Sequence, residues 1–161
     1  MQRATEKTVI TKNLMNNNKK TIRKARKADI DFIHHLLDME PFKYDDGLPY
    51  DRKWIEKLVL SKKCLTLVYE TDGEIKGFIS GEKLISNAIL LWFCAVKKEY
   101  QNKVIGIKLY MEFEMQCKEA GINAILAYGY KTSAGLLEKL SFYSNDYTYK
   151  EFYKPLNESW A

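Results

Sequence analysis

The run Ala88–Val96, with the sequence AILLWFCAV, constrains the fold of this chain more than any other feature. Its nine residues include no charged residue, no glycine and no proline. A strand that is apolar on both of its alternating faces is typical of a sheet that is covered on both sides. We therefore expect this run to be a central strand of an α/β sheet.

An amphipathic helix is expected directly after this strand. From Val104 to Ala120, residues suited to an inward face recur every three or four positions, and Gly121 ends the pattern. The expected inward-facing residues are Ile105, Leu109, Phe113, Gln116 and Ala120.

Shorter patterns predict the remaining elements. The pair Asp72-Gly73 separates two alternating runs and is a strong hairpin signal. Two helices are expected before it, one beginning at Asp29 as a cap and one around Trp54. Their inward-facing residues are expected to be Ile30, Ile33 and Leu37 in the first helix, and Trp54, Ile55 and Leu58 in the second. Further strands are expected at residues 21–25, 122–129 and 147–156, the second of them buried, with a short helix at 133–142.

This order of elements predicts the fold class. It is α/β, or α+β in some schemes, with a mixed, mainly antiparallel central sheet of about six to seven strands and about four helices. A chain of 161 residues that is 46% hydrophobic has room for one sizeable core. We expect a single domain over residues 21–161.

Residues 1–20 are expected to form a basic, flexible extension. Residues 1–27 hold nine Lys or Arg against one Glu, and the first 20 show no apolar periodicity. Such an arm could bind nucleic acid, but a solvated extension is the interpretation that we favour, so a nucleic-acid partner is not expected.

The composition also bounds the location. The sequence has no apolar run of about 20 residues and no apolar stretch near its start that would suit a signal peptide. We therefore expect a soluble, cytoplasmic protein without a membrane partner. The three cysteines, Cys64, Cys94 and Cys117, lack the spacing of metal ligands and are expected to be small core residues in a reducing compartment.

The stretch between the apolar strand and the following helix indicates an anion site. A helix N-terminus offers N–H groups without internal partners, and Gly106 would let the backbone approach a phosphate closely. Gln101, Asn102 and Lys103 would add donors beside it. From spacing alone, an ordinary turn with a packing glycine explains the stretch equally well.

The same stretch carries a resemblance to a known family. VKKEYQNKVIGIKL, which begins at Val96, resembles the acyl-CoA motif of the GNAT superfamily of N-acetyltransferases, written Val-x-Pro-x-x-Gln/Arg-x-x-Gly-x-Gly/Ala. Val96, Gln101 and Gly106 match, whereas Lys98 and Val104 replace the proline and the first glycine. LLEKLSF, at residues 136–142, resembles the family's FYEKLGF, and the strand order is similar across residues 21–156.

The resemblance implies acetyl-CoA as co-substrate, no metal, and transfer of an acetyl group to a primary amine of a small molecule or a protein. It implies that the pyrophosphate lies on backbone N–H groups and that the pantetheine arm pairs with the apolar strand. The implied cofactor-binding residues are Cys94, Ala95, Val96, Gln101, Asn102, Lys103, Val104, Ile105, Gly106 and Ile107. A GNAT-like module that binds acyl-CoA without turnover is the alternative.

Catalytic residues are less clearly indicated. Leu137 stands where the family often has a tyrosine that acts as a general acid. Leu90, three residues before Phe93, stands where the histone-modifying branch has its glutamate base. The candidates are then Glu82, Glu40 in a segment resembling that of arylalkylamine acetyltransferases, and Tyr130, with Tyr128 and Tyr143 as further tyrosines. For Glu40 and Glu82 we favour the alternative that they are surface carboxylates without a catalytic role, whereas Tyr130 could equally be an aromatic residue that only shapes the site.

Aromatic and acidic residues in the regions that select the acceptor in this family suit a cationic, partly apolar amine. They could also belong to the core or to a homodimer contact. These residues are Phe42, Tyr44, Asp45, Asp46, Tyr50, Trp54, Tyr147 and Phe152.

Overall fold

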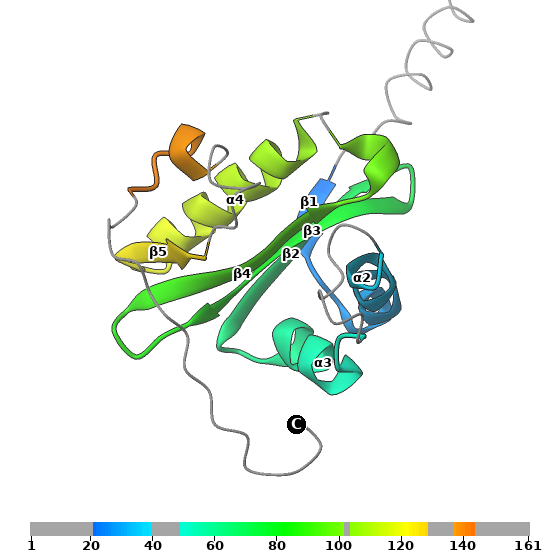
Figure 1. Cartoon of the computed structure of the whole chain (residues 1–161). Helices are drawn as coiled ribbons and strands as arrows, with labels where there is room; N and C mark the ends of the chain where they lie inside the picture. Colours follow the sequence, from blue (N-terminus) through cyan, green and yellow to red (C-terminus); the bar gives the residue numbers. More distant parts are fainter. Residues whose placement is uncertain (1–20, 40–48, 102–103, 129–136, 144–161) are drawn as a thin grey trace, which may run out of the picture. The chain divides into compact units, whose positions relative to one another are not determined.

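The computed structural model describes residues 21–39, 49–101, 104–128 and 137–143. The chain divides into two compact units, Met1–Tyr128 and Gly129–Ala161, and each is described here by itself. In the first unit, a sheet lies between helix α4 on one face and helices α2 and α3 on the other (Figure 1). This arrangement is a three-layer α/β fold.

The sheet of the first unit is mixed and mainly antiparallel, as predicted. Its strands are β1 (Thr21–Lys24), β2 (Cys64–Thr71), β3 (Glu74–Lys83), β4 (Ala88–Val96) and β5 (Ala124–Ala127), in the spatial order β1-β2-β3-β4-β5. Neighbours are antiparallel from β1 to β4, whereas β4 and β5 are parallel. The described residues contain five strands where six to seven were predicted. The predicted strand at 147–156 lies outside the described residues.

The β2–β3 hairpin confirms the prediction from Asp72-Gly73. Asp72 has φ 55° and Gly73 has φ 77°, so both central residues of the turn adopt left-handed conformations. Two such residues form the type I′ turn, whose twist matches that of the strands it joins. Glycine takes this conformation without strain, and aspartate tolerates it better than most residues.

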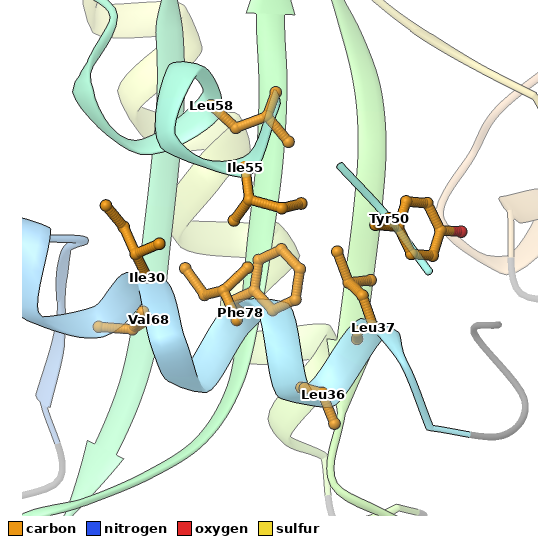
Figure 2. Close-up of a cluster of buried hydrophobic side chains, with 10 residues drawn as sticks. Ile30, Leu36, Leu37, Tyr50, Ile55, Leu58, Val68 and Phe78 are labelled. Carbon is orange, nitrogen blue, oxygen red and sulfur yellow. The ribbon is translucent and has the colours of Figure 1, made fainter. Parts of the chain in front are cut away.

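Helices α2 (Ile30–Leu37) and α3 (Arg52–Leu60) cover one face of the sheet. Ile30 and Leu37 from α2, and Ile55 and Leu58 from α3, are buried with Phe78 of β3. Figure 2 shows these side chains converging between the two helices and the strands. The predicted inward faces of both helices are therefore confirmed, except that Trp54 is only half-buried.

The predicted cap at Asp29 is wrong in its details. Asp29 precedes α2, but its carboxylate makes no capping bond to that helix. Instead, Oδ2 accepts from the Arg26 backbone N–H at 2.6 Å and from Arg23 Nη1 at 2.7 Å. Asp29 ends a short 3₁₀ helix, η1 (Lys27–Asp29), so its carboxylate ties that turn to β1 rather than capping α2.

Helix α4 (Ile105–Glu119) covers the opposite face and connects β4 to the parallel strand β5. Its buried residues are Ile105, Leu109, Tyr110, Phe113 and Cys117. The prediction was right for Ile105, Leu109 and Phe113 but wrong for Gln116 and Ala120, which are half-buried and exposed. The buried row continues every four residues to Cys117, which turns those two residues away from the sheet.

The apolar strand β4 is second from the edge of the described sheet, and β3 is the central strand. Trp92 and Cys94 of β4 are exposed, and β5 is alternately exposed and half-buried rather than buried. Of the cysteines, Cys117 is buried, Cys64 is half-buried and Cys94 is exposed, so the expectation of a core residue was wrong for Cys94. The middle of β4 is therefore apolar but accessible.

The second unit contributes a helical turn at residues 137–139. The N–H groups of Leu140 and Phe142 donate to the Leu137 carbonyl at 3.1 and 3.0 Å. In the part of the chain that the structure describes, no helix is long and apolar enough to cross a membrane.

Candidate active site

Strand β4 loses its neighbour half-way along. Its pairing with β5 runs only from Ala88 to Leu91, whereas its pairing with β3 continues to Val96. On the side of β5, the segment from Trp92 to Val96 therefore has no strand partner among the described residues. Backbone N–H and C=O groups on such an edge can pair with an extended ligand.

A β-bulge lies where the pairing with β5 stops. Gly81 of β3 is opposite Leu91 of β4, but the preceding Ser80 is opposite Phe93, so Trp92 is the extra residue. A bulge interrupts the alternation of side chains along a strand. Trp92 and Phe93 consequently lie on the same face, where both rings contact Trp54 of α3, with centroids 5.6 and 5.4 Å away.

The start of α4 lies beside the open segment of β4. A Cβ added to Gly106 would meet only Cys94 Sγ at 3.8 Å and Val96 Cγ2 at 3.9 Å, which are ordinary van der Waals distances. The fold therefore does not require glycine here, although glycine lowers helix stability by about 1 kcal/mol relative to alanine. A ligand that approaches the backbone closely would explain the residue.

The residue before α4 has an unusual backbone. Val104 has φ 30° and ψ 2°, in the left-handed region, and it makes no side-chain cap to the helix. This conformation is strained for a β-branched residue. Val104 stands at the position where the acyl-CoA motif usually has glycine. Glycine adopts the left-handed conformation without strain, which explains why the motif prefers it at this position.

The N-terminus of α4 has features that favour an anion. It carries no side-chain cap and no acidic residue in its first turn. The helix dipole places a partial positive charge there, next to the first N–H groups. The N–H groups of the first helical turn, the partial positive charge and the lack of a side chain at Gly106 together suit a phosphate group.

The predicted cofactor-binding residues differ in how far the structure exposes them. Ala95, Val96 and Ile105 are buried, whereas Cys94, Val104 and Ile107 are exposed and Gly106 is half-buried. Gln101 donates from Nε2 to the Val96 carbonyl at 3.0 Å, so its side chain closes the turn after β4. Asn102 and Lys103 lie outside the described residues.

The Cys94 thiol faces the start of α4. Its sulfur is 3.8 Å from the Gly106 carbonyl oxygen. Burial raises the pKa of this thiol to about 12, although the residue as a whole is exposed by surface area. A pKa in this range keeps the thiol protonated at neutral pH, and the exposed area of the residue leaves it accessible.

Of the three main catalytic candidates, Glu82, Glu40 and Tyr130, only Glu82 lies within the described part of the chain. It lies opposite Leu90 across β3 and β4 and is partly exposed. Its Oε1 is 3.4 Å from Nζ of Lys57 on α3. Glu40 and Tyr130 lie outside the described residues, and Tyr128 is an exposed residue just beyond β5. Tyr143 is exposed in the second unit.

Sequence reasoning missed Trp92 and Lys57. Trp92 was assigned to the buried interior because it lies in an uncharged run, and a bulge leaves no clear sequence signal. Among the predicted acceptor-side residues, Tyr50 is buried in the core, and Trp54 packs on Tyr50 with its ring stacked at 5.9 Å. The others, Phe42, Tyr44, Asp45, Asp46, Tyr147 and Phe152, lie outside the described residues.

Comparison with known families decides the assignment. The model of the acetyltransferase (GNAT) family matches residues 30–142 of this chain. The chain belongs to the GNAT acetyltransferase family. The match includes both the open segment of β4 and the start of α4. Comparison with curated protein sequences gave no match.

Solved structures of GNAT proteins share the fold at low sequence identity. A possible acetyltransferase from Clostridium difficile 630 has a TM-score of 0.71 and 23% identity, covering 84% of this chain and 98% of its own. AAC(6')-Iy in complex with a bisubstrate analog, CoA-S-monomethyl-acetylneamine, has a TM-score of 0.68 and 13% identity, covering 84% and 99%. The ribosomal-protein-S18-alanine N-acetyltransferase from Escherichia coli has a TM-score of 0.64 and 15% identity, covering 76% and 74%. At these identities the likeness shows the fold alone.

Proposed function

We propose that this GNAT protein transfers an acetyl group from acetyl-CoA to a primary amine. The observation that carries the proposal is the open edge of β4 from Trp92 to Val96, which lies beside an uncapped helix N-terminus with an unfilled Gly106. An extended arm ending in an anionic pyrophosphate matches this pair of features. Two solved GNAT structures, AAC(6')-Iy and the S18-alanine acetyltransferase, bear names that refer to CoA or to N-acetyl transfer.

The backbone supplies most of the proposed cofactor site. The N–H groups at the start of α4 would hold the pyrophosphate, and the backbone of Cys94–Val96 would pair with the amide groups of the pantetheine arm. When bound, acetyl-CoA supplies the activated acetyl group. This arrangement would direct the thioester toward the bulge at Trp92, where the pairing with β5 ends.

Glu82 is the proposed general base. Primary alkylamines are mostly protonated at neutral pH, so the nitrogen must lose one proton before attack, to free its electron pair, and a second proton as the amide forms. The nitrogen forms a bond to the acetyl carbon as the carbon–sulfur bond breaks, and the electron pair of that bond leaves on sulfur. One of these protons passes to the Glu82 carboxylate, directly or through water, and the other passes to water or to the leaving thiolate. Glu40 as an alternative base, and Tyr130 as the donor of a proton to the leaving sulfur, remain predictions.

Binding of acyl-CoA without turnover is the second candidate function. It is favoured by the leucines at two positions that are frequently catalytic in the family, Leu90 and Leu137. The carboxylate of Glu82, directly across from Leu90, favours the enzyme over this alternative. A cytoplasmic location and a homodimer also remain predictions.

A thiol-release assay with acetyl-CoA tests the proposal. Polyamines, arylalkylamines, aminoglycosides, amino acids and peptides are offered in turn, and thermal melts record binding of acetyl-CoA. We expect a raised melting temperature with acetyl-CoA and thiol release with at least one amine class. A melting shift without release for any amine would support the binding module, and no shift would contradict both functions.

A further inference from the structure

We propose that the acceptor is a primary amine joined by a short alkyl chain to an aromatic ring. This inference deepens the proposed function, on which it rests. Three side chains carry it, namely Trp92 of β4, Trp54 of α3 and Glu82 of β3. They lie on the same face of the sheet, at the bulge where the open segment of β4 begins.

The two tryptophans form an accessible aromatic surface. Trp92 is 38% exposed, and its ring meets Trp54 edge-on at 5.6 Å and 87°. The ring of Trp54 is fixed in place by further contacts, because it also stacks on Tyr50 and contacts Phe93. Trp92 is thus a large apolar ring on an ordered support, with part of its area left to solvent. Aromatic ligands bind such rings through burial of area and through ring–ring contacts.

A carboxylate lies at a suitable distance from this surface. Leu90 and Trp92 are two positions apart on the same face of β4, about 7 Å along the strand. Glu82 is directly across from Leu90 on β3. A ligand with its ammonium group at Glu82 and its ring on Trp92 therefore needs a short linker of a few bonds. The half-buried Leu90 between them is apolar, as is an alkyl linker.

The partner of Glu82 does not prevent binding of a cation. Lys57 Nζ is 3.4 Å from Glu82 Oε1, and the Lys57 side chain is 57% exposed. An ion pair with so exposed a lysine contributes about 1 kcal/mol or less, so an ammonium group of the ligand can replace it at low cost. Lys57 also disfavours long polycationic acceptors, because their additional charges would meet a like charge beside Glu82.

Substrate preference tests the acceptor class. The ratio of kcat/KM for 2-phenylethylamine to kcat/KM for propylamine is measured for the wild type and for Trp92→Leu. We expect a ratio of at least about 10 in the wild type, from ring contact and buried area, and a ratio near 1 in the variant. Met111→Ala, an exposed apolar residue on the opposite face of the sheet, is the control and should keep the wild-type ratio. If Trp92→Leu does not fold, Trp92→Phe should fold and give an intermediate ratio.

A binding measurement separates this inference from the proposed function. Calorimetry compares 2-phenylethyltrimethylammonium, which cannot be acetylated, with tetramethylammonium. We expect the aryl compound to bind at least about tenfold more tightly than tetramethylammonium. Glu82→Gln should weaken binding of the aryl compound. Tighter binding of the aryl compound without acetylation of any amine would support a binding site for arylalkylammonium ligands and remove the catalytic proposal. Acetylation of propylamine or spermidine at rates equal to that of 2-phenylethylamine, with no aryl preference in binding, would overturn the inference alone.

Discussion

Glu82 and Leu90 lie directly opposite each other on the antiparallel strands β3 and β4. Side chains in such a cross-strand pair lie on the same face, with Cβ atoms about 5 Å apart. By the resemblance of Phe93-Cys94-Ala95 to the histone-modifying branch of the family, Leu90 corresponds to the glutamate base of that branch, and Glu82 offers a carboxylate on the neighbouring strand. This relationship makes Glu82 the most testable catalytic candidate.

We expect Glu82→Gln to lower kcat by about 10²-fold or more, as is typical for loss of a general base, while the melting shift with acetyl-CoA stays unchanged. The double variant Glu82→Gln/Leu90→Glu returns a carboxylate to the same face and should recover part of the lost rate. Glu56→Gln, a half-exposed glutamate of α3 that pairs with Arg52, is the matched control. Wild-type turnover in Glu82→Gln would remove this residue from the mechanism.

Gly106 should be required by the cofactor and dispensable for the fold. Gly106→Glu places a side chain and a negative charge at the start of α4, where the pyrophosphate is proposed to bind. Acetyl-CoA at about 100 times its wild-type Kd should add roughly 2.7 kcal/mol to the free energy of unfolding of the wild type. The variant should not gain this stability. Gly106→Ala should fold at least as stably as the wild type, since its Cβ meets only ordinary contacts. Thermal melts with and without acetyl-CoA measure both effects. A full shift in folded Gly106→Glu would place the cofactor elsewhere.

Val104→Gly should relieve backbone strain. A left-handed residue with a Cβ costs roughly 1–2 kcal/mol, which glycine avoids, whereas glycine loses about 0.5–1 kcal/mol through the entropy of the unfolded chain. The free energy of unfolding should therefore stay level or rise by up to about 1 kcal/mol. Lys108→Gly, in the first turns of the same helix, should lower it by about 1 kcal/mol. Urea titrations compare the two, and equal losses would show that Val104 is unstrained.

The ion pair between Arg23 and Asp29 should make the free energy of unfolding depend on pH in the acid range. Burial alone would raise the pKa of Asp29, but hydrogen bonds from Arg23 and from the Arg26 N–H outweigh it and hold the pKa below its ordinary value. A lowered pKa stabilises the fold above the unfolded-state value of about 4, and this stability is lost as the pH falls through the folded-state value.

We expect Asp29→Asn to lose about 1–3 kcal/mol at pH 7 and to be less sensitive than the wild type between about pH 5 and pH 2. Asp31→Asn is the control, because the Asp31 side chain is 80% exposed and its ion pair with Arg52 should contribute little. Urea midpoints at pH 7 and pH 3 give both comparisons. Equal pH dependence of Asp29→Asn and wild type would contradict the assignment.

Much of the fold followed from local patterns. The hairpin at Asp72-Gly73 was predictable because its turn needs two left-handed residues, and the inward faces of α2 and α3 followed from helical spacing. The motif from Val96 to Gly106 indicated the family, which the family model confirms, and it is the basis for the proposed place of the cofactor site. These features depend on residues that are close together in the sequence.

Only the tertiary structure decided which apolar residues are accessible. Nothing in the run Ala88–Val96 shows that β5 stops at Ala127, that Trp92 is an extra residue opposite Ser80 and Gly81, or that Cys94 is exposed. Glu82 and Leu90 are close in sequence, on consecutive strands, but only the register of β3 and β4 places them opposite each other. The sequence by itself determined the elements and the motif, because these depend on backbone preference and periodicity. The register of β3 and β4 and the end of β5 depend on contacts between strands rather than on local preference, and they decided how β4 is exposed.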